Sequence, residues 1–293
     1  MESNEIKKAI IPIAGLGTRF LPLSKALSKE FFPLVDKPII QHIVEEMRDS
    51  GIKEIVFVVS PQQKTILNYF KRSTELEKLL IKRKKENILN ELKEFHEQFK
   101  DISFSYVVQE KPNGDGHAIV QGLKLQKQET VATSFGDDVF YSETPAIAQL
   151  ISIYKTCNAP VVGLKRVPRD KVPAYGTVLA EKIANNLYKV KKIVEKPKPE
   201  EVLSDLVIVG KHILTPDVFS YLRKAKPSAR GEIILTEVLA KMLDEGKTIY
   251  GYELKGEWLE CGDKSKWLKS FFYMSLKDQK YGPELKEYLK MIK

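Results

Sequence analysis

The sequence predicts an α/β protein with a mixed, mainly parallel β-sheet flanked by helices. Short apolar, β-branched segments alternate with helical patterns through the first half of the chain, which is typical of a parallel sheet covered on both faces. After about residue 159 the apolar segments follow one another more closely, which indicates a smaller β region. The chain has 293 residues and no repeat or obvious linker, so we expect a single α/β body.

The first half contains the alternating elements. Apolar and β-branched segments predict strands over 8–14, 54–60, 102–108 and 130–138. Helical spacing predicts helices over 39–51, over 75–99 as one long charged helix, and from Gly116 onward. Because ligands bind at the carboxyl ends of parallel strands, we expect the functional residues in the loops that follow these strands.

The second half is richer in strands. Strand patterns cover 159–167, 175–197 and 205–214, and the Asn185-Asn186 pair within the second of them predicts a hairpin turn. A helix is expected over 231–246, a further strand over 248–262, and helices at the end of the chain.

The composition is that of a basic globular protein. Lys and Arg outnumber Asp and Glu by 48 to 39, and the net charge of +9 favours phosphate-bearing partners of some kind. The densest basic run, Lys82–Lys85, has acidic neighbours and no interleaved aromatic residues, which indicates a solvated helix face rather than a nucleic-acid site. Cys157 and Cys261 lack metal-ligand spacing, so neither a zinc site nor a disulfide framework is expected.

The cellular location of the protein is predicted from its apolar segments, which are too short to span a membrane. No apolar stretch approaches the ~20 residues that span a bilayer. The segment "MESNEIKKAII" places acidic residues before a short apolar run, unlike a secretory signal peptide. We therefore expect a cytoplasmic protein without a membrane partner.

The first expected strand ends in the glycine turn Gly15-Leu16-Gly17-Thr18-Arg19-Phe20. A dinucleotide-binding turn requires a third glycine where Phe20 stands and an acidic residue about 20 positions later. Both are missing, and the P-loop pattern is missing as well. The turn therefore does not have the pattern of either of these phosphate-binding sites.

The loop after the glycines is basic. It carries Arg19, Lys25 and Lys29, and three prolines keep it from forming an uninterrupted helix. Glycines let a nucleotide lie against bare backbone, and the cations can neutralise a triphosphate. We interpret the loop as a triphosphate clamp; the alternative is a shaped turn with surface charge.

Two further strand ends carry charged residues. Phe135-Gly136-Asp137-Asp138 closes an apolar strand, either as an Asp-rich turn or as the holder of a divalent cation. Val194-Glu195-Lys196-Pro197 closes another, either as a solvated turn or as a ligand site. Because successive side chains of a strand point to opposite faces, Glu195 and Lys196 are not expected to form a simple mutual salt bridge.

These segments resemble a known family. "AGLGTRFLPLSKALSKEFFPLVDKPII" is similar to the N-terminal fingerprint of sugar-nucleotide pyrophosphorylases, and the similarity returns in "QEKPNGDGHA", "FGDD", "PAYGTV", "VEKPKP", "LVIVGKHIL", "GEIILTEVL" and "WLECGDK". The helical "ELEKLLIKRKKENILNEL" and the "GDGHA" segment favour the uridylyltransferase subgroup. The resemblance implies one domain with a Rossmann-like, GT-A-like nucleotidyltransferase fold. Residues 1–158 would form its nucleotide-binding half and residues 159–293 its sugar-phosphate and metal half.

The resemblance also implies where the nucleotide binds. It places the uracil against the backbone near Gly15 and Gly114, next to Gln109, whose amide has the donors and the acceptor that suit a pyrimidine edge. The family more often has Leu where Asp115 stands, a difference that concerns the detailed contacts of this loop. The implied nucleotide-binding residues are Ala14, Gly15, Gly17, Gln109, Gly114 and Gly116.

The implied cofactor is Mg²⁺. By resemblance its first ligand is Asp137 and its second ligand lies in the segment "WLECGDK", where Glu260 stands in place of the usual Asp. A Glu is one methylene longer, and the near-octahedral geometry of Mg²⁺ tolerates displacement poorly. Asp263 is therefore the alternative second ligand.

The sugar phosphate and the reacting phosphates are the remaining ligands that the resemblance implies. Tyr175 and Gly176 would lie near the hexose ring, Glu195 would bind sugar hydroxyls, and Lys196 would hold the sugar phosphate. The residues assigned to the reacting phosphates are Arg19, Lys29 and Lys196.

The implied reaction is uridylyl transfer from UTP to glucose 1-phosphate, which yields UDP-glucose and pyrophosphate without a covalent enzyme intermediate. The alternatives are the same chemistry with dTTP, GTP or another sugar 1-phosphate, a non-catalytic regulatory protein that binds sugar nucleotides, and a nucleic-acid-binding module. We expect no nucleic-acid partner. We expect a homo-oligomer, a dimer or a tetramer, with the long charged helix as a subunit contact.

Overall fold

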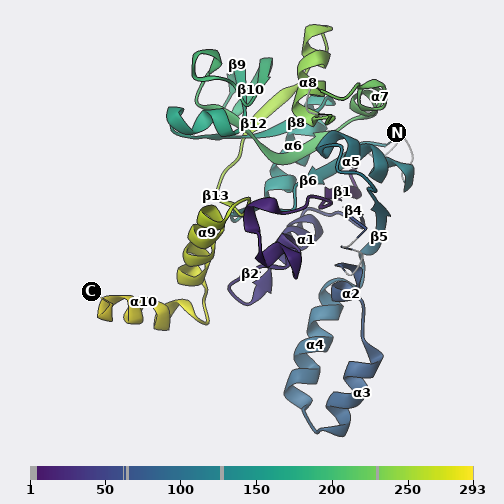
Figure 1. Cartoon of the computed structure of the whole chain (residues 1–293), viewed down its shortest axis with the longest axis vertical. Helices are drawn as coiled ribbons and strands as arrows, with labels where there is room; N and C mark the ends of the chain where they lie inside the picture. The colour runs from purple at the N-terminus through teal and green to yellow at the C-terminus, as the bar shows by residue number, and fades with distance from the viewer. Residues whose placement is uncertain (1–4, 62, 64–65, 126–128, 229–230, 293) are drawn as a thin grey trace.

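The computed structural model describes residues 5–61, 63, 66–125, 129–228 and 231–292 (Figure 1). Its centre is a nine-stranded mixed sheet with the strand order β5-β4-β1-β6-β11-β8-β12-β10-β9. This arrangement confirms the α/β fold with a mixed sheet that the sequence predicts. The sheet takes strands from both halves of the chain, so the halves share one sheet rather than forming two.

The N-terminal part of the sheet is parallel. Its strands are β1 (Lys8–Pro12), β4 (Glu54–Val59), β5 (Ser103–Val108) and β6 (Val131–Ser134). β1 lies between β4 and β6, with both of which it runs parallel, and β4 runs parallel to β5. The carboxyl ends of these strands therefore meet at one edge of the sheet, where ligands of α/β proteins bind.

Helices cover both faces of the inner strands of this sheet, which are therefore buried on both sides. Ala9 and Ile11 of β1 belong to one core cluster, together with residues of α1 (Ile39–Asp49) and α6 (Ala146–Cys157). Ile10, which points the other way, belongs to a second cluster. That cluster includes residues of α5 (Asp115–Gly122), α7 (Pro216–Lys224) and α8 (Leu235–Asp244).

The C-terminal part of the sheet is mostly antiparallel. β11 (Leu206–Leu214), buried along its whole length, joins the two parts because it lies between β6 and β8 and runs antiparallel to both. β9 and β10 form the predicted hairpin, whose turn holds Asn186 at a φ of 60°. The remaining strands of this part are β8 (Val161–Arg166), β9 (Gly176–Ala184), β10 (Leu187–Glu195) and β12 (Tyr250–Glu253).

Two expected strands are each divided. The strand expected over 248–262 is in fact β12 and β13 (Glu257–Glu260), separated at Gly256, whose φ of 104° suits glycine. The strand expected over 130–138 ends at Ser134, and Asp138 begins β7 (Asp138–Tyr141). β7 and β13 pair outside the main sheet, with Glu260 opposite Asp138. This small sheet brings the two predicted metal segments together.

The basic loop after β1 is a series of single 3₁₀ turns, η1 (Thr18–Phe20), η2 (Leu23–Lys25) and η3 (Lys29–Phe31). This agrees with the prolines that break it up. The ring of Phe20 is buried under the loop, 4.9 Å from the Phe32 ring in an edge-to-face contact. The residue that stands in place of a third glycine therefore anchors the loop by its side chain.

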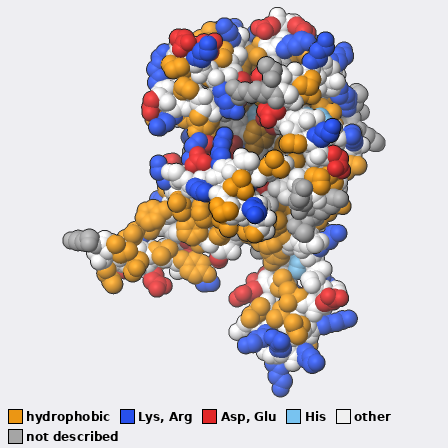
Figure 2. All heavy atoms as spheres, viewed as in Figure 1, with side chains coloured by type: hydrophobic (Ala, Val, Ile, Leu, Met, Phe, Trp, Pro, Cys, Tyr) orange, Lys and Arg blue, Asp and Glu red, His pale blue; other side chains and the backbone are white. Residues whose placement is uncertain are grey.

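Two helical arms project from the body (Figure 1). The long helix expected over 75–99 is wrong, because the chain reverses at Lys84, which has a φ of 52°, and forms the hairpin α3 (Thr74–Lys82) and α4 (Glu86–Gln98). The basic run therefore lies at the tip of this hairpin (Figure 2). The second arm is α9 (Lys264–Lys277) and α10 (Gly282–Met291).

The remaining elements are short. They are β2 (Pro33–Leu34), β3 (Lys37–Pro38), α2 (Ile66–Phe70), η4 (Leu123–Leu125), η5 (Arg169–Ala174) and η6 (Pro199–Glu201). None of the helices in the described part of the chain combines the length and the apolar character that crossing a bilayer requires.

Candidate functional site

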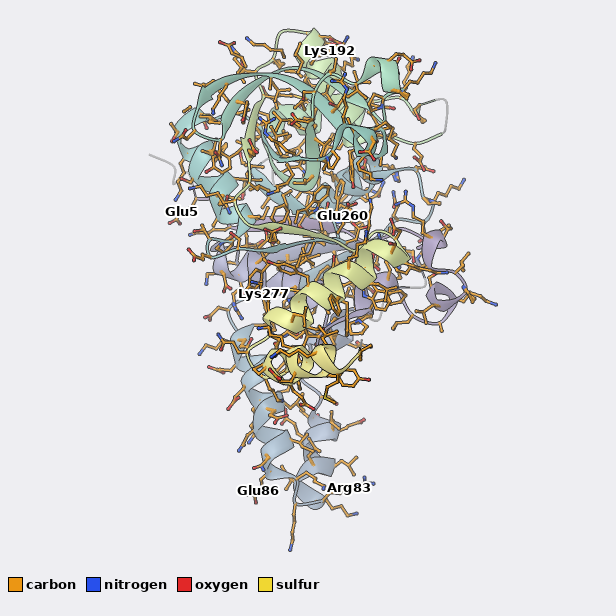
Figure 3. The ribbon with its side chains drawn as sticks, turned by 90° about the vertical axis from the view of Figure 1, so that its left-hand side faces the viewer. Glu5, Arg83, Glu86, Lys192, Glu260 and Lys277 are labelled. Atoms are coloured by element: carbon orange, nitrogen blue, oxygen red, sulfur yellow. The ribbon has the colours of Figure 1, made fainter. Side chains whose placement is uncertain are left out.

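A cavity of about 470 Å³ collects most of the predicted charged residues. It lies where the turn after β6, the end of β10, β11 and β13 meet, and Figure 3 shows Glu260 at this junction, above α9. We call it the charged cavity. The predicted residues that line it are Arg19, Asp137, Tyr175, Gly176, Glu195, Lys196 and Glu260, together with Asp263, the alternative metal ligand.

Asp137 lies in the turn between β6 and β7 and is held by two cations. The Lys29 Nζ atom lies 2.5 Å from Asp137 Oδ2, although Lys29 is not among the residues that line the charged cavity. Burial acts to raise the pKa of Asp137, but Lys29 and Arg19 outweigh it and lower this pKa. Burial likewise opposes the charge of Lys29, and Asp137 and Glu30 still raise the pKa of its ammonium group. Asp137 and Lys29 are therefore both charged at neutral pH.

Asp138 has a structural role that the sequence analysis missed. Its Oδ2 accepts a hydrogen bond of 2.7 Å from the Gly210 amide, and its Oδ1 accepts one of 2.7 Å from Trp258 Nε1. Asp138 thus joins β7 to β11 and β13. Burial, followed by the charge of Asp137, raises the pKa of Asp138 to about 7. The sequence signal that could have identified this role is the second Asp of the "FGDD" motif.

Glu260 is engaged on both carboxylate oxygens. Lys266 Nζ lies 2.7 Å from its Oε1, and the Tyr175 hydroxyl donates to its Oε2. Burial and the bond to Glu260 raise the pKa of Tyr175 to about 12. Asp263, the alternative metal ligand, caps α9, because its Oδ1 accepts the Lys266 amide at 3.0 Å. The sequence analysis did not identify Lys266, which lies just beyond "WLECGDK".

The donor set of the charged cavity fits a magnesium ion that is held together with substrate phosphates. The Cys261 amide donates to the Asp137 carbonyl at 2.8 Å, which keeps the segments of Asp137 and Glu260 adjacent. Within the described residues, no group of three or more His, Cys, Asp or Glu is arranged to hold a metal. Mg²⁺ is commonly bound by one or two carboxylates with phosphates and waters. Two carboxylates are therefore sufficient here.

The turn that follows β10, at one end of the cavity, is strained. Lys196 follows β10 with a φ of 44°, a conformation that costs of order 1–3 kcal/mol for a residue other than glycine. Its Nζ lies 3.5 Å from Glu195 Oε1, so the expectation that the two do not pair is wrong. The reason is that Lys196 lies beyond the strand, where side chains no longer alternate. Thr236, missed in "GEIILTEVL", donates to Glu195 Oε2 at 2.7 Å.

The glycine turn after β1 borders a second cavity. This cavity, of about 680 Å³, is lined by Gly15 and Lys25, and by Gln63 from the loop after β4. No heavy atom other than those of its chain neighbours lies within 4 Å of the position that a Cβ atom at Gly15 would take. Gly17 has a φ of 61°, and Ala14 is buried. Backbone is therefore open to a ligand at Gly15.

The other predicted nucleotide-binding residues pack against one another in a second glycine turn, residues 109–116. Gln109 Nε2 donates to the Gly114 carbonyl at 3.1 Å, and the Gly116 amide donates to the Ile233 carbonyl at 2.9 Å. A Cβ atom on Gly114 would lie 2.4 Å from that carbonyl oxygen. None of these three predicted residues lines the charged cavity or the cavity at Gly15.

Asp115 explains why this turn lies against α8. Its Oδ1 accepts the amide of Leu235, the first residue of α8, at 2.9 Å, and that of Gly116 at 2.6 Å. The carboxylate thus satisfies an N–H group at the start of a helix, where such groups lack helical partners. The residue at which the chain departs from the family pattern therefore has a structural role.

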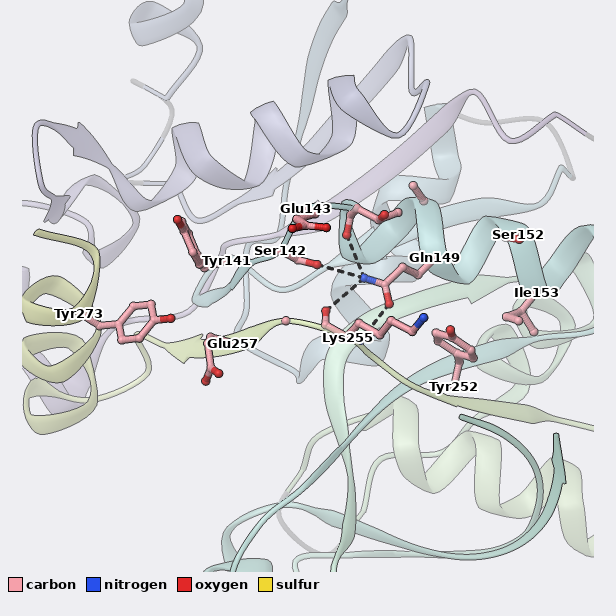
Figure 4. Close-up of a pocket in the computed structure, with 13 residues that line it drawn as sticks. Tyr141, Ser142, Glu143, Gln149, Ser152, Ile153, Tyr252, Lys255, Glu257 and Tyr273 are labelled. Atoms are coloured by element: carbon pink, nitrogen blue, oxygen red, sulfur yellow. Dashed lines mark hydrogen bonds between the residues drawn. The ribbon is translucent and has the colours of Figure 1, made fainter. Parts of the chain in front are cut away.

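A third cavity, of about 630 Å³, lies at the other end of β7 and β13 (Figure 4). The Gln149 amide closes one side of it, with its Nε2 donating to the Lys255 carbonyl at 3.1 Å and its Oε1 accepting the Lys255 amide at 2.9 Å. None of the predicted site residues lines this cavity.

Comparisons with known proteins agree with this geometry. A model of the family described as nucleotidyl transferase matches residues 8–274. UTP–glucose-1-phosphate uridylyltransferases of Staphylococcus haemolyticus and Staphylococcus saprophyticus are each 38% identical to the chain, over 98% and 99% of its length and the same shares of their own.

Solved structures agree as well. A UDP-glucose pyrophosphorylase in complex with UDP-glucose has a TM-score of 0.85 at 33% identity and covers 94% of this chain and 100% of its own. The UTP-bound UGPase from Acinetobacter baumannii has a TM-score of 0.90 at 32% identity and covers 99% and 100%. The family resemblance of the sequence is thereby confirmed, and the chain belongs to the nucleotidyl transferase family.

Proposed function

We propose that the protein transfers a uridylyl group from UTP to glucose 1-phosphate and releases pyrophosphate. The observation that carries this proposal is the charged cavity, in which Arg19, Lys196, Asp137 and Glu260 surround one space. The near full-length similarity to proteins named UTP–glucose-1-phosphate uridylyltransferase supports both substrates. Among the residues that the structure describes, we find no feature that favours another nucleotide, a regulatory role or nucleic-acid binding.

The chemistry needs positioning more than acid–base catalysis. A phosphate oxygen of glucose 1-phosphate forms a bond to the α-phosphorus of UTP, and the bond from that phosphorus to the bridging oxygen of the β-phosphate breaks. The attacking phosphate is already an anion at neutral pH, so no side chain has to remove a proton. Charge stabilisation and alignment therefore carry the reaction.

The cations of the site divide this work. Lys196 holds the attacking phosphate, and the adjacent Glu195, oriented by Thr236, binds hydroxyls of the sugar. Arg19 and Lys29 bind the triphosphate and the leaving pyrophosphate, since both flank Asp137 at the end of β6. Tyr175 and Gly176 contact the hexose ring and complete the pocket.

Asp137 and Glu260 are the residues that would hold Mg²⁺. A bound Mg²⁺ ion offsets the negative charge of the phosphates that meet in the cavity. We favour Glu260 over Asp263 as the second ligand, because the Asp263 carboxylate caps α9. The Glu260 carboxylate, by contrast, is bound by the side chains of Lys266 and Tyr175, which can exchange partners.

We assign the nucleotide to the loops that follow β1 and β5, with Ala14, Gly15, Gly17, Gln109, Gly114 and Gly116 as its binding residues. This assigns residues 1–158 mainly to the nucleotide and residues 159–293 mainly to the sugar phosphate and the second metal ligand. Asp137 from the first half and Glu260 from the second then act on the same phosphates.

We also propose that the protein is a cytoplasmic homo-oligomer, a dimer or a tetramer. The hairpin α3–α4 supports a subunit contact because it projects from the body and exposes Leu76, Leu79, Ile81 and Ile88. Light scattering coupled to size-exclusion chromatography measures the mass, and a purely monomeric protein at micromolar concentration would contradict this assembly.

The test of the function is a coupled pyrophosphate-release assay with UTP, glucose 1-phosphate and Mg²⁺. We expect release that depends on all three. Parallel reactions with dTTP, GTP and ATP, and with other sugar 1-phosphates, measure the selectivity for each substrate. Binding of UDP-glucose without pyrophosphate release under any tested metal would instead identify a regulatory protein.

A further inference from the structure

The carboxylate of Glu260 is neutralised by a lysine that the proposed reaction does not use. Lys266, six residues further along the chain in the first turn of α9, places its Nζ 2.7 Å from Glu260 Oε1 and 3.0 Å from the Tyr175 hydroxyl. The same Nζ lies 4.9 Å from the centre of the Tyr175 ring. Lys266 is therefore the immediate counter-ion of the second proposed metal ligand.

An ammonium group and a divalent cation compete for one carboxylate, because both are attracted to it and they repel each other. We infer that Lys266 is an exchangeable counter-ion of Glu260, and this inference rests on the proposed function. Through this exchange, divalent-cation binding at Glu260 depends on the sugar phosphate. The phosphate dianion in the charged cavity attracts Lys266 away from Glu260, and the freed carboxylate then binds the cation. Lys266 is thus a positioning residue, acting through Glu260.

The surroundings of Lys266 permit this exchange. Its side chain is 33% exposed, lines the charged cavity beside Lys196 and has a flexible four-carbon stem. Each lysine has a second carboxylate at 3.9 Å, Asp263 for Lys266 and Glu30 for Lys29. Lys29, the counter-ion of Asp137, differs in its exposure, because only 18% of its side chain is accessible to solvent. The lysine at Glu260 is therefore the one that moves more readily.

Tyr175 gives the exchange a structural link to the sugar-phosphate turn. Its hydroxyl contacts both Glu260 and Lys266, and its backbone carbonyl accepts the Lys196 amide at 3.0 Å. A change of partner at Glu260 therefore changes the contacts of Tyr175, whose backbone is bonded to Lys196, the residue proposed to hold the sugar phosphate.

The experiment measures Mn²⁺ binding to the full chain by electron paramagnetic resonance, without and with glucose 1-phosphate. Wild type is compared with Lys266→Met, and with Lys269→Met as a control that removes the same charge from an exposed position on the same helix. Glu260→Gln tests whether Glu260 is a ligand at all. Lys266→Gln replaces Lys266→Met if the latter does not fold.

We expect Lys266→Met to bind Mn²⁺ about tenfold more tightly than wild type in the absence of sugar phosphate. Glucose 1-phosphate should tighten Mn²⁺ binding about tenfold in wild type and in Lys269→Met, and several-fold less in Lys266→Met. Because coupling is reciprocal, Mn²⁺ should tighten glucose 1-phosphate binding by the same factors.

Equal Mn²⁺ affinity and equal enhancement in wild type and Lys266→Met would overturn the inference. Unchanged Mn²⁺ affinity in Glu260→Gln would overturn it as well, because the exchange needs Glu260 as a ligand. Neither result bears on whether wild type releases pyrophosphate from UTP, which the coupled assay decides separately.

Discussion

The charged cavity and the glycine turn at residues 109–116 are organised by different forces. In the cavity, the side chains are held by salt bridges between Lys29 and Asp137 and between Lys266 and Glu260. In the glycine turn the contacts are hydrogen bonds to backbone groups, including those that the Asp115 carboxylate accepts from the Gly116 and Leu235 amides. Backbone there approaches backbone so closely that Gly114 has no room for a Cβ atom.

This difference teaches how substitutions should act in each region. The charged residues of the cavity contact their partners mainly through their charges. A substitution that keeps the shape of the side chain but removes its charge should therefore impair the reaction and leave the protein folded. In the glycine turn the shape of the backbone is what is held, so the addition of one methyl group should impair the fold first. The predictions below test this distinction.

Asp137→Asn is expected to have the largest effect. The substitution keeps the shape of the side chain but removes the charge that faces Lys29 and Arg19. We expect kcat/KM for pyrophosphate release to fall by about 10³ or more. The free energy of unfolding should fall as well, because Lys29 loses its main counter-ion, but the protein should remain folded. Asp101→Asn, at an exposed position before β5, is the control. Full activity at ordinary Mg²⁺ concentrations would remove Asp137 from the metal site.

Lys196→Ala is expected to come next. It removes the cation proposed to hold the attacking phosphate, so turnover should fall by about 10²–10³, while UTP binding measured by calorimetry stays largely intact. Lys192→Ala, at an exposed position on β10 (Figure 3), is the control and should retain activity. Normal kinetics in Lys196→Ala would refute its assigned role.

Gly114→Ala tests the glycine turn, with Gly15→Ala as its counterpart. Gly114 has a φ of 96° and faces the Ile233 carbonyl, so the added methyl should lower the free energy of unfolding by about 2–4 kcal/mol in urea denaturation. At Gly15 the space is open, and stability should change by less than ~1 kcal/mol.

Activity then separates the two glycines further. If the nucleotide lies against the backbone of Gly15, the methyl group should raise the KM for UTP about tenfold in a protein that is otherwise stable. An unchanged KM in Gly15→Ala would place the nucleotide elsewhere. Wild-type stability in Gly114→Ala would show that the turn is less constrained than its packing indicates.

The sequence predicted the parts of the site that follow from strand order. Parallel strands end at one edge, and motifs at strand ends therefore meet; this reasoning placed Asp137 near the basic loop. The resemblance supplied Glu195, Lys196 and Glu260, which line the same cavity in the structure. These features depend on periodicity and on motifs, both of which are visible in the linear sequence.

Other features depend on contacts that have no local signal. The break at Lys84 was missed because helical spacing continues across it, and a single residue with positive φ leaves little trace in the sequence. The pairing of Glu195 with Lys196 depends on the position at which β10 ends. A strand that ended one residue later would point the two side chains to opposite faces. Lys266 and Thr236 reach their partners only through the packing of α9 and α8.

His212 gives the smallest predicted effect and tests the floor of the charged cavity. The ring is buried, and within the described residues neither of its nitrogens has a hydrogen-bond partner. Burial, together with Lys211, lowers the pKa of His212 to about 3. Folding thus favours the neutral imidazole, and this contribution to stability is fully present above the ordinary histidine pKa of about 6.5.

Below pH 6.5 the unfolded chain takes up a proton at this residue and the folded protein does not, so stability falls as the pH falls toward 3. His212→Leu removes this group. Between pH 6.5 and pH 5.5, wild type should lose about 1 kcal/mol more unfolding free energy than the variant, because the unfolded imidazole is already half protonated at pH 6.5. Urea denaturation of wild type and His212→Leu at both pH values measures this difference. The contributions of the other titrating groups are the same in both proteins and cancel. Parallel pH profiles would show that the imidazole is not held neutral, and that charge reaches the floor of the cavity as well as its walls.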